Sequence, residues 1–286
     1  MALGTAQFGY SYGIANQSGQ VCRDEAAAIL DHAWRMGLHT LDTAIAYGES
    51  EQRLGEIGIE RWRVISKLPS IPEPCLDVAG SVQEWVMGSL RRLRIPKLWG
   101  LLLHQPKQLL GPQGDALFQA LLALKDQGMV EKIGVSIYDP GELDALCSRY
   151  QHDLVQAPFN VLDRRLATSG WLHRLREVGI EVHTRSTFLQ GLLLMEASTR
   201  PTRFDRWHSL WDEWDRWLEG QALTPLQACL GFVLSHPEID CVVVGVDSLK
   251  QLQEILRSAN TKEVSVPLSL ATDDLQLVNP SNWAKI

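Results

Sequence analysis

A local unit made of a helix, a glycine and a short apolar strand recurs along this chain and restricts its fold more than any other feature. In three of these units the amphipathic segment ends at Gly37, Gly128 or Gly179. A glycine just past a helix supplies the left-handed conformation that ends the helix at low energetic cost. The residues that follow each glycine form a short, bounded apolar run, as expected of a buried parallel strand.

Helix starts and strands continue this alternation. Capping patterns predict helix starts at Ser81 (with Glu84), Asp139 before Pro140, Thr224 before Pro225, and Ser248 (with Gln251). Apolar runs predict strands over residues 2–6, 40–43, 64–68, 101–104, 132–136, 154–156, 181–184 and 241–244. Eight strands separated by helices favour an α/β fold, a closed (β/α)8 TIM barrel, as one domain over residues 1–286. A doubly wound open sheet is the alternative, weakened because no G-x-G-x-x-G follows the first strand.

Composition excludes several classes of protein. The net charge is −7 and the basic residues are dispersed, which argues against nucleic-acid binding. No apolar run approaches the roughly 18 residues of a membrane helix, and a strand beginning at Ala2 leaves no room for a secretory signal. The five cysteines form no C-x-x-C pair and the eight histidines no H-x-x-x-H pair. We therefore expect no metal, and reduced thiols in a cytoplasmic protein.

Polar side chains end successive predicted strands, and this pattern points to a site. These residues are Asp42, Lys67, His104, Ser136, Gln156, Arg185 and Ser186. In a barrel the carboxyl ends of all strands meet at one face, the face that carries active sites. Each residue alone could simply cap its strand at the solvent boundary. Six strand ends in succession favour mutual pairing or a ligand, because a buried unpaired charge costs several kcal/mol.

The four most reactive residue types at these ends are Asp42, Tyr47, Lys67 and His104, and their chemistry forms a set. A lysinium within about 4 Å of a tyrosinate stabilises it by Coulomb energy on the order of 4 kcal/mol at an effective dielectric of about 20. We therefore expect Lys67 to lower the pKa of Tyr47, with Asp42 holding the lysine charged and His104 hydrogen-bonding a substrate oxygen. Such a site protonates an oxygen that becomes an alkoxide. A nicotinamide cofactor would supply the hydride.

Six segments together resemble the aldo-keto reductase superfamily, and the opening LGTAQFGYSYGIANQSG resembles a bacterial branch of it. The segments are LDTAIAYGESEQRLGE (41–56), VISKL (64–68), LLLHQP (101–106), IGVSIYDPGEL (133–143), VQAPFNVLDRR (155–165) and VVVGVDSLKQL (242–252). The resemblance runs from Leu3 to about Leu256. The D-T-A-x-A-Y-G-x-S-E-x-x-L-G string is highly specific, whereas the lone lysine and histidine are informative only beside it.

The resemblance implies a carbonyl reductase or alcohol dehydrogenase that binds NADP(H), or else NAD(H), without a Rossmann fold. It implies that Asp42, Tyr47, Lys67 and His104 form the catalytic tetrad, with Tyr47 as the proton donor. It also implies that Ser136 and Gln156 hold the nicotinamide carboxamide and that Ser186 contacts the cofactor phosphates. The partner would be a small carbonyl or alcohol substrate, and the protein a monomer or small homo-oligomer.

Three positions depart from the family pattern. Ile137 replaces the asparagine that commonly follows the serine after strand 5, which removes one carboxamide contact. Arg185 stands where an aromatic residue usually stacks on the nicotinamide, and because a guanidinium plane can also stack we expect Arg185 to bind the cofactor there. The loop after strand 8, where many members bind a 2′-phosphate, reads Gly245, Val246, Asp247, Ser248, Leu249, Lys250, Gln251. Only Lys250 is basic there, and Asp247 could accept a hydrogen bond from a ribose 2′-hydroxyl.

Two other functions remain open at this point. A cofactor-binding regulatory subunit of the same fold is one, although the complete tetrad argues against it. A Schiff-base lyase using Lys67 is the other, although Asp42 would keep the amine charged.

Several remaining features have structural explanations. We expect Trp207, Trp211, Trp214 and Trp217 to form a buried helix stripe and His183 to be packed. Glu51 would serve only the helix dipole, and Arg164 and Arg165 beside Asp163 would be a solvated cluster. The segment 189–204 is either a loop over the cofactor or a surface excursion.

Overall fold

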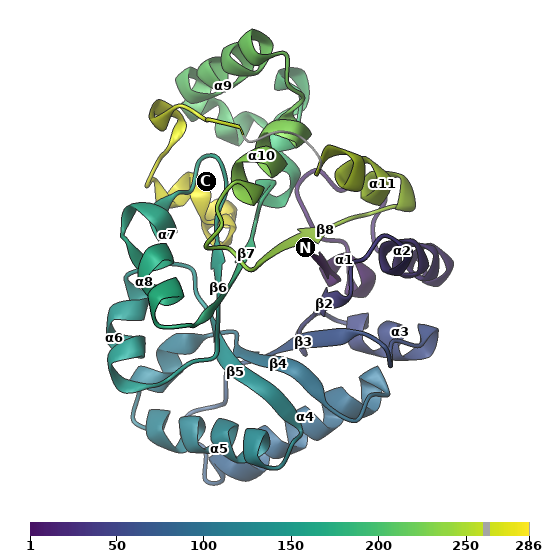
Figure 1. The fold of residues 1–286 in the computed structure, drawn as a ribbon, viewed down its shortest axis with the longest axis vertical. Helices are drawn as coiled ribbons and strands as arrows, with labels where there is room; N and C mark the ends of the chain where they lie inside the picture. Colours follow the sequence, from purple (N-terminus) through teal and green to yellow (C-terminus); the bar gives the residue numbers. More distant parts are fainter. Residues whose placement is uncertain (260–263, 286) are drawn as a thin grey trace.

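Eight parallel strands form a closed barrel in which each strand pairs with the next along the chain and β8 pairs with β1. The computed structural model describes residues 1–259 and 264–285, and Figure 1 shows the strands surrounded by helices. The strands are β1 (Ala2–Gly4), β2 (Thr40–Asp42), β3 (Arg63–Leu68), β4 (Leu98–Leu103), β5 (Val130–Ser136), β6 (Leu154–Pro158), β7 (Glu181–Arg185) and β8 (Cys241–Gly245). The barrel prediction is confirmed and the open-sheet alternative is wrong.

Helices connect the strands and cover the outside of the barrel. The α-helices are α1 (Ala6–Gly9), α2 (Arg23–Arg35), α3 (Ser50–Ile57), α4 (Val78–Leu93), α5 (Gly114–Asp126), α6 (Glu142–Arg149), α7 (Arg165–Thr168), α8 (Trp171–Glu177), α9 (His208–Gln221), α10 (Pro225–Leu234), α11 (Leu249–Ser258) and α12 (Leu275–Val278). Short 3-10 segments are η1 (Pro106–Leu110), η2 (Leu189–Leu194), η3 (Ala197–Thr199), η4 (Thr202–Trp207), η5 (Leu268–Leu270) and η6 (Pro280–Lys285). Within the described ranges, none of these helices has both the length and the apolar character needed to cross a bilayer.

The predicted helix ends are confirmed where glycine is the signal. Gly37, Gly128 and Gly179 have φ values of +84°, +71° and +75°, the left-handed region that an L side chain rarely adopts. Among the helix starts, Thr224 forms a capping box with Gln227, and the Ser248 side chain accepts a hydrogen bond from the Gln251 amide.

One predicted helix start is wrong, because an earlier aspartate caps the helix instead of Ser81. Helix α4 begins at Val78 after Asp77, whose Oδ1 accepts from the Gly80 amide at 2.8 Å. Ser81 therefore lies inside the helix and does not cap it. The start predicted at Asp139 is confirmed within one turn: Asp139 Oδ1 accepts from the Gly141 amide at 2.8 Å and the Asp139 amide donates to Glu142 Oε1 at 3.1 Å, so Asp139 caps the turn that leads into α6 at Glu142.

The interior of the barrel changes from apolar to polar along the strand direction. Ile65, Leu102 and Leu154 form a buried apolar cluster separate from the main core, which lies between the barrel and its helices. The residues two positions further along these strands share the inward face, because strand side chains alternate. They are Lys67, His104 and Gln156. The apolar layer therefore forms the floor of a polar layer at the carboxyl end of the barrel.

Helix α9 lies outside the repeating unit, at the upper end of the molecule beside the C-terminal segment (Figure 1). Trp211, Trp214 and Leu218 are buried on one side of it, while Trp207 and Trp217 are partly buried against the core. The prediction of a packed tryptophan stripe is confirmed. His183 is also packed, with its side chain 2% exposed and its Nε2 2.7 Å from Glu181 Oε1.

Glu51 was expected to act only through the helix dipole, and this expectation is wrong. Glu51 is only 1% exposed. Its Oε1 accepts hydrogen bonds from Ser66 Oγ at 2.7 Å and from Ser89 Oγ at 2.6 Å. Its Oε2 accepts two hydrogen bonds from Arg92, at 2.9 and 2.6 Å. Glu51 therefore ties α3 to β3 and α4 through a buried charge.

We expect Glu51→Gln to lower the free energy of unfolding by about 1 to 3 kcal/mol, since it removes the charge-assisted hydrogen bonds that the buried carboxylate accepts, while the partly exposed Arg92 can be solvated. Urea unfolding followed by circular dichroism measures this change. Glu56→Gln, at an exposed position on the same helix, is the control and should change the value by no more than about 0.5 kcal/mol. Equal losses in the two variants would contradict the assignment.

Candidate active site

The four residues predicted as a catalytic set lie together in the wall of one cavity of about 400 Å³ at the carboxyl end of the barrel. Lys67 Nζ lies 2.6 Å from Asp42 Oδ1 and donates a second hydrogen bond to the Thr43 carbonyl at 3.1 Å. The ammonium is 5.1 Å from the centre of the Tyr47 ring. That ring lies 5.9 Å from the His104 imidazole, centre to centre. The structure therefore brings a carboxylate, an ammonium, a phenol and an imidazole around one space.

Gln156 holds Asp42 from across the barrel. Its Nε2 donates to Asp42 Oδ2 at 2.7 Å, and its Oε1 accepts from Ser136 Oγ at 3.2 Å. Strands β2 and β6 are not neighbours, so this contact spans the interior. Gln156 is completely buried and is not part of the cavity wall, whereas Ser136 is. Of the pair expected to hold a carboxamide, only Ser136 faces the cavity.

The expectation that Lys67 lowers the pKa of Tyr47 is wrong for the free protein. Burial raises the pKa of Tyr47, and the negative charge of Asp42 raises it further. These two effects outweigh the attraction of the Lys67 ammonium, 5.1 Å from the ring centre, for a tyrosinate. Burial also lowers the pKa of Lys67, an effect that the Asp42 carboxylate opposes.

His104 is held neutral. Burial lowers its pKa to about 4, and the positive charges of Lys67 and Arg185 contribute to the shift. A neutral imidazole has one N–H donor and one acceptor nitrogen, so His104 can donate a hydrogen bond to a carbonyl oxygen without carrying a charge.

The residues that follow β7 form a second part of the cavity wall. Arg185, Ser186 and Thr187 all line it. Ser186 adopts a positive φ of 64°, and Thr187 Oγ1 is a buried hydroxyl with no hydrogen-bond partner in the described parts of the chain. A buried hydroxyl without a partner is uncommon in native structures, and a ligand in the cavity would satisfy it. The residues here thus fit a ligand rich in hydrogen-bonding oxygens, such as a dinucleotide.

The residues after β8 form a third part of the cavity wall. Gly245, Asp247 and Gln251 line the cavity, and so does Glu254. Asp247 Oδ1 accepts from Asn16 Nδ2 at 2.9 Å, and the Asp247 amide donates to Gln251 Oε1 at 2.7 Å. Lys250 is not part of the wall: its side chain is 84% exposed and lies 4.0 Å from Glu254. The expected basic residue is therefore absent from this wall.

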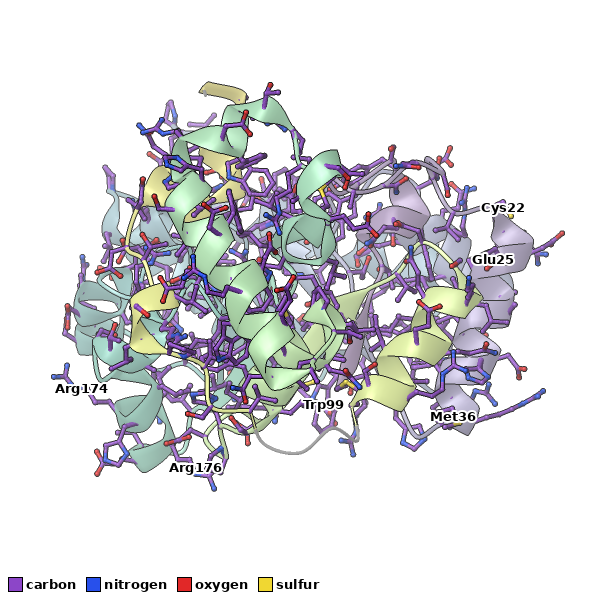
Figure 2. The ribbon with its side chains drawn as sticks, turned by 90° about the horizontal axis from the view of Figure 1, so that it is seen from above. Cys22, Glu25, Met36, Trp99, Arg174 and Arg176 are labelled. Atoms are coloured by element: carbon purple, nitrogen blue, oxygen red, sulfur yellow. The ribbon has the colours of Figure 1, made fainter. Side chains whose placement is uncertain are left out.

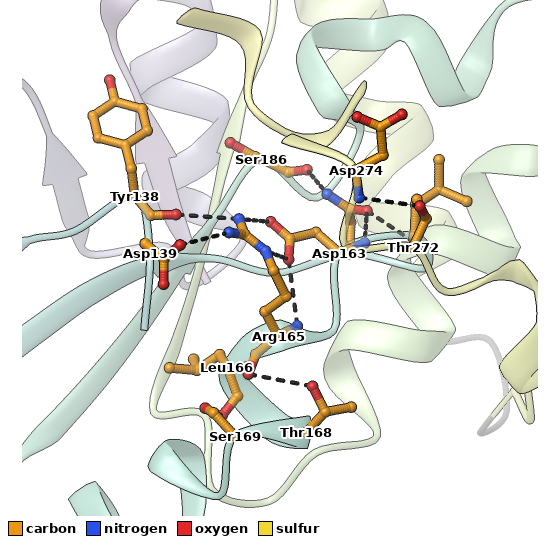
Figure 3. A network of polar contacts seen from close by, with 12 residues as sticks. Tyr138, Asp139, Asp163, Arg165, Leu166, Thr168, Ser169, Ser186, Thr272 and Asp274 are labelled. Carbon is orange, nitrogen blue, oxygen red and sulfur yellow. Dashed lines mark hydrogen bonds and ion pairs between the residues drawn. The ribbon is translucent and has the colours of Figure 1, made fainter. Parts of the chain in front are cut away.

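The cluster expected to be solvated is instead a buried network that positions two cavity loops. Asp163 and Arg165 form a two-bond ion pair, with both hydrogen bonds 2.8 Å long. Arg165 also donates to the Tyr138 carbonyl at 3.2 Å, and Asn160 Nδ2 donates to the Ser186 carbonyl at 3.0 Å. Figure 3 shows these contacts meeting between the loops after β5, β6 and β7.

Arg164 was also expected to be solvated and is also buried. Its guanidinium donates to the carbonyls of Val266 and Pro267, at 3.1 and 2.8 Å, and so holds the C-terminal segment. Both arginines are buried because the chain after β6 is covered by residues distant in the sequence. The adjacent charged residues Asp163, Arg164 and Arg165 gave no indication in the sequence that distant residues would cover them.

Several cavity residues were missed from the sequence, among them Tyr12, Tyr138 and Gln190. Tyr12 belongs to the loop after β1, and Tyr138 directly follows Ser136-Ile137, so adjacency to a strand end was the available signal. Gln190 belongs to η2, at the start of the segment 189–204, which the sequence left as either a loop over the cofactor or a surface excursion. Its carbonyl accepts from the Ile14 amide at 3.1 Å and its side chain donates to Tyr12 at 3.3 Å. This part of the segment covers the cavity.

The family model described as "Aldo/keto reductase family" matches residues 1–266. The chain belongs to the aldo/keto reductase family. It is therefore related to oxidoreductases that use nicotinamide cofactors, as its sequence resemblance implied.

Two relatives are similar over most of their length. An uncharacterized oxidoreductase of Bacillus subtilis, YqkF, is 25% identical over 284 residues, covering 92% of each chain. A D-threo-aldose 1-dehydrogenase of a Pseudomonas species is 27% identical over 313 residues, covering 94% of this chain and 93% of the relative.

Solved structures of aldo/keto reductases share the fold. The holo form of AKR11C1 from Bacillus halodurans superposes with a TM-score of 0.71 at 20% identity, covering 93% of this chain and 88% of that one. PA4992 from Pseudomonas aeruginosa gives a TM-score of 0.66 at 24% identity, covering 90% and 88%.

We expect the His104 imidazole to titrate with a midpoint near 4 and not near its ordinary value of 6.5, because burial beside two cations disfavours the imidazolium. Its contribution to stability should then be complete above about pH 6.5 and decline as the pH falls toward 4. NMR titration of the histidine Cε1 protons measures the midpoint, and His104→Asn identifies the resonance by its loss. A midpoint near 6.5 for that resonance would contradict the described environment.

Proposed function

We propose that this protein reduces an aldehyde, ketone or sugar-like carbonyl to an alcohol, or catalyses the reverse reaction, with NAD(P)(H) as cofactor. The observation that supports this most is the meeting of Asp42, Tyr47, Lys67 and His104 around one cavity. When bound, the nicotinamide supplies or accepts the hydride. The relative named D-threo-aldose 1-dehydrogenase supports a sugar-like substrate by its name.

Each of the four residues has a role that follows from its contacts. The Tyr47 hydroxyl donates its proton to the carbonyl oxygen as that oxygen becomes an alkoxide. A phenol can do this even with a raised pKa, because an aliphatic alcohol is a still weaker acid. Neutral His104 donates a hydrogen bond to the same oxygen. Lys67, positioned by Asp42, stabilises the negative charge left on Tyr47.

The cofactor would lie along the walls formed after β5, β7 and β8. Ser136 is the wall residue available to the carboxamide, and Ser186 with Thr187 offers hydroxyls to phosphate oxygens. Gly245 permits close approach beside Gln7: a Cβ at residue 245 would lie 2.5 Å from Gln7 Nε2. Gln156 would act through Ser136 and Asp42, since its amide contacts both.

We further propose that NAD(H) is preferred to NADP(H). By resemblance, the adenosine ribose lies beside the residues after β8, where Asp247 and Glu254 are part of the wall and Lys250 is not. Carboxylates repel a 2′-phosphate, whereas a carboxylate can accept from a 2′-hydroxyl.

Tyr47→Phe should lower kcat about 100- to 10,000-fold, because it removes the proton donor and leaves the ring in place. The dissociation constant of the reduced cofactor, measured by fluorescence, should stay within about threefold of the wild-type value. Undiminished turnover in this variant would contradict the mechanism. Tight cofactor binding by the wild type without turnover of any carbonyl would indicate a regulatory subunit instead, and borohydride trapping of substrate on Lys67 a lyase.

Side-by-side titration should give a dissociation constant for NADH about tenfold lower than for NADPH, a difference of about 1.4 kcal/mol. Asp247→Ser should reduce the ratio of the NADPH dissociation constant to the NADH dissociation constant, because it removes one carboxylate from the cavity wall. Asp24→Ser, which changes an exposed carboxylate on α2 outside the cavity, should leave the ratio unchanged. Tighter binding of NADPH by the wild type would overturn the preference.

A further inference from the structure

Ser186, at the start of the loop after β7, has a backbone conformation that an L residue rarely adopts. Its φ is +64°, in the left-handed region, where contacts of the Cβ atom are unfavourable. Such residues persist where neighbouring contacts hold them, and they cluster at ligand-binding sites. Ser186 and Thr187 both belong to the cavity wall, where the cofactor phosphates would lie. The conformation of Ser186 therefore sets how these two hydroxyls are presented to the cofactor.

The Asn160 side chain holds this conformation from the neighbouring loop. Backbone pairing between the ends of β6 and β7 continues to the Phe159 amide, which donates to the Arg185 carbonyl at 3.0 Å. One residue later a side chain takes over, because Asn160 Nδ2 donates to the Ser186 carbonyl at 3.0 Å. The Leu189 amide donates to the same carbonyl at 2.9 Å. The direction of this carbonyl fixes the peptide plane after Ser186, so both donors support its left-handed backbone.

Asn160 is itself fixed, because both polar atoms of its side chain have partners. The residue is completely buried. Its Oδ1 accepts from the amides of Leu162 and Asp163, both at 2.9 Å, and so closes the turn after β6. Asp163 in turn pairs with Arg165 in the network of Figure 3. This burial is particular to the network, since Arg174 of the following helix α8 is exposed and points away from the molecule (Figure 2).

The two contacts of Asn160 place different demands on its side chain. Aspartate or serine could close the same turn, since each offers an oxygen to nearby amides. Neither could hold Ser186 in the same way, because an ionised aspartate has no donor and a serine side chain is shorter. Asparagine combines the acceptor that closes the turn with a donor that reaches the next loop.

We propose that Asn160 is a positioning residue of the cofactor site, which holds the wall after β7 in its binding conformation through the hydrogen bond to the Ser186 carbonyl. This inference rests on the proposed function, in which Ser186 and Thr187 contact the cofactor phosphates. Asn160 is not part of the cavity wall, so it acts through Ser186. When the hydrogen bond is lost, a smaller fraction of molecules has the binding conformation, and the affinity for the cofactor falls by the same factor.

The test measures the dissociation constants of NADH and NADPH by fluorescence, for Asn160→Ser in three backgrounds. In the wild type and in Ser186→Ala, Asn160→Ser should raise them about tenfold, the effect of one lost hydrogen bond. In Ser186→Gly it should raise them less than about threefold, because glycine adopts the left-handed conformation without support. Alanine and glycine both lack the serine hydroxyl, so the difference between these two backgrounds reports the backbone conformation.

Asn279→Ser is the matched control. Asn279 Oδ1 also closes a turn, accepting from the Ser281 amide at 3.1 Å, and Asn279 does not line the cavity. This variant should leave both dissociation constants unchanged. If Asn160→Ser does not fold, Asn160→Asp replaces it, since aspartate keeps the acceptor that closes the turn. Its added charge acts equally in the alanine and glycine backgrounds, so a larger effect in the alanine background still reports the lost donor.

The positioning role and the proposed function fail in different ways. If a cofactor binds but the effect of Asn160→Ser is absent, or is equal in the Ser186→Ala and Ser186→Gly backgrounds, the positioning role is overturned and the proposed function stands. A wild type that binds neither NADH nor NADPH would contradict the proposed function, and the positioning role with it.

Discussion

The ion pair between Asp42 and Lys67 is the interaction on which the rest of the site depends. Both side chains are almost completely buried, at 6% and 1% exposure, and their charged atoms are 2.6 Å apart. Neither charge would be tolerated at the end of the barrel without the other. Because the pair is compensated, it fixes the polar layer above the apolar floor without imposing a net charge on the cavity. Tyr47 and His104 are arranged around this pair.

Barrel register explains why residues far apart in the sequence meet here. Asp42 pairs in register with Ile65 across β2 and β3, and Ser136 pairs with Gln156 across β5 and β6. Lys67 lies two residues beyond Ile65 on the same inward face of β3 and reaches the Asp42 carboxylate from there, and Ser136 Oγ donates directly to Gln156 Oε1. Gln156 then closes the layer by reaching Asp42 across the interior. The same geometry that closes the barrel thus positions the site.

The sequence predicted the barrel, the strand ends and the four residues of the set, because alternation and the chemistry at strand ends are local signals. It did not predict burial that depends on distant residues. Glu51 looked like a first-turn acid until Ser89 and Arg92 of α4 enclosed it, and Arg165 looked solvated until the surrounding loops covered it. The direction of the Tyr47 pKa shift was wrong for the same reason. A pairwise estimate with Lys67 omits both burial and Asp42.

A double-mutant cycle with Asp42→Asn and Lys67→Met measures the coupling of this pair most directly, with urea unfolding as the readout. Each single variant leaves one buried charge uncompensated and should lower the free energy of unfolding by about 3 to 5 kcal/mol. The double variant leaves no such charge, so its loss should be smaller than the sum of the single losses by at least about 2 kcal/mol. Losses that add to within about 0.5 kcal/mol would contradict the central place given to this ion pair.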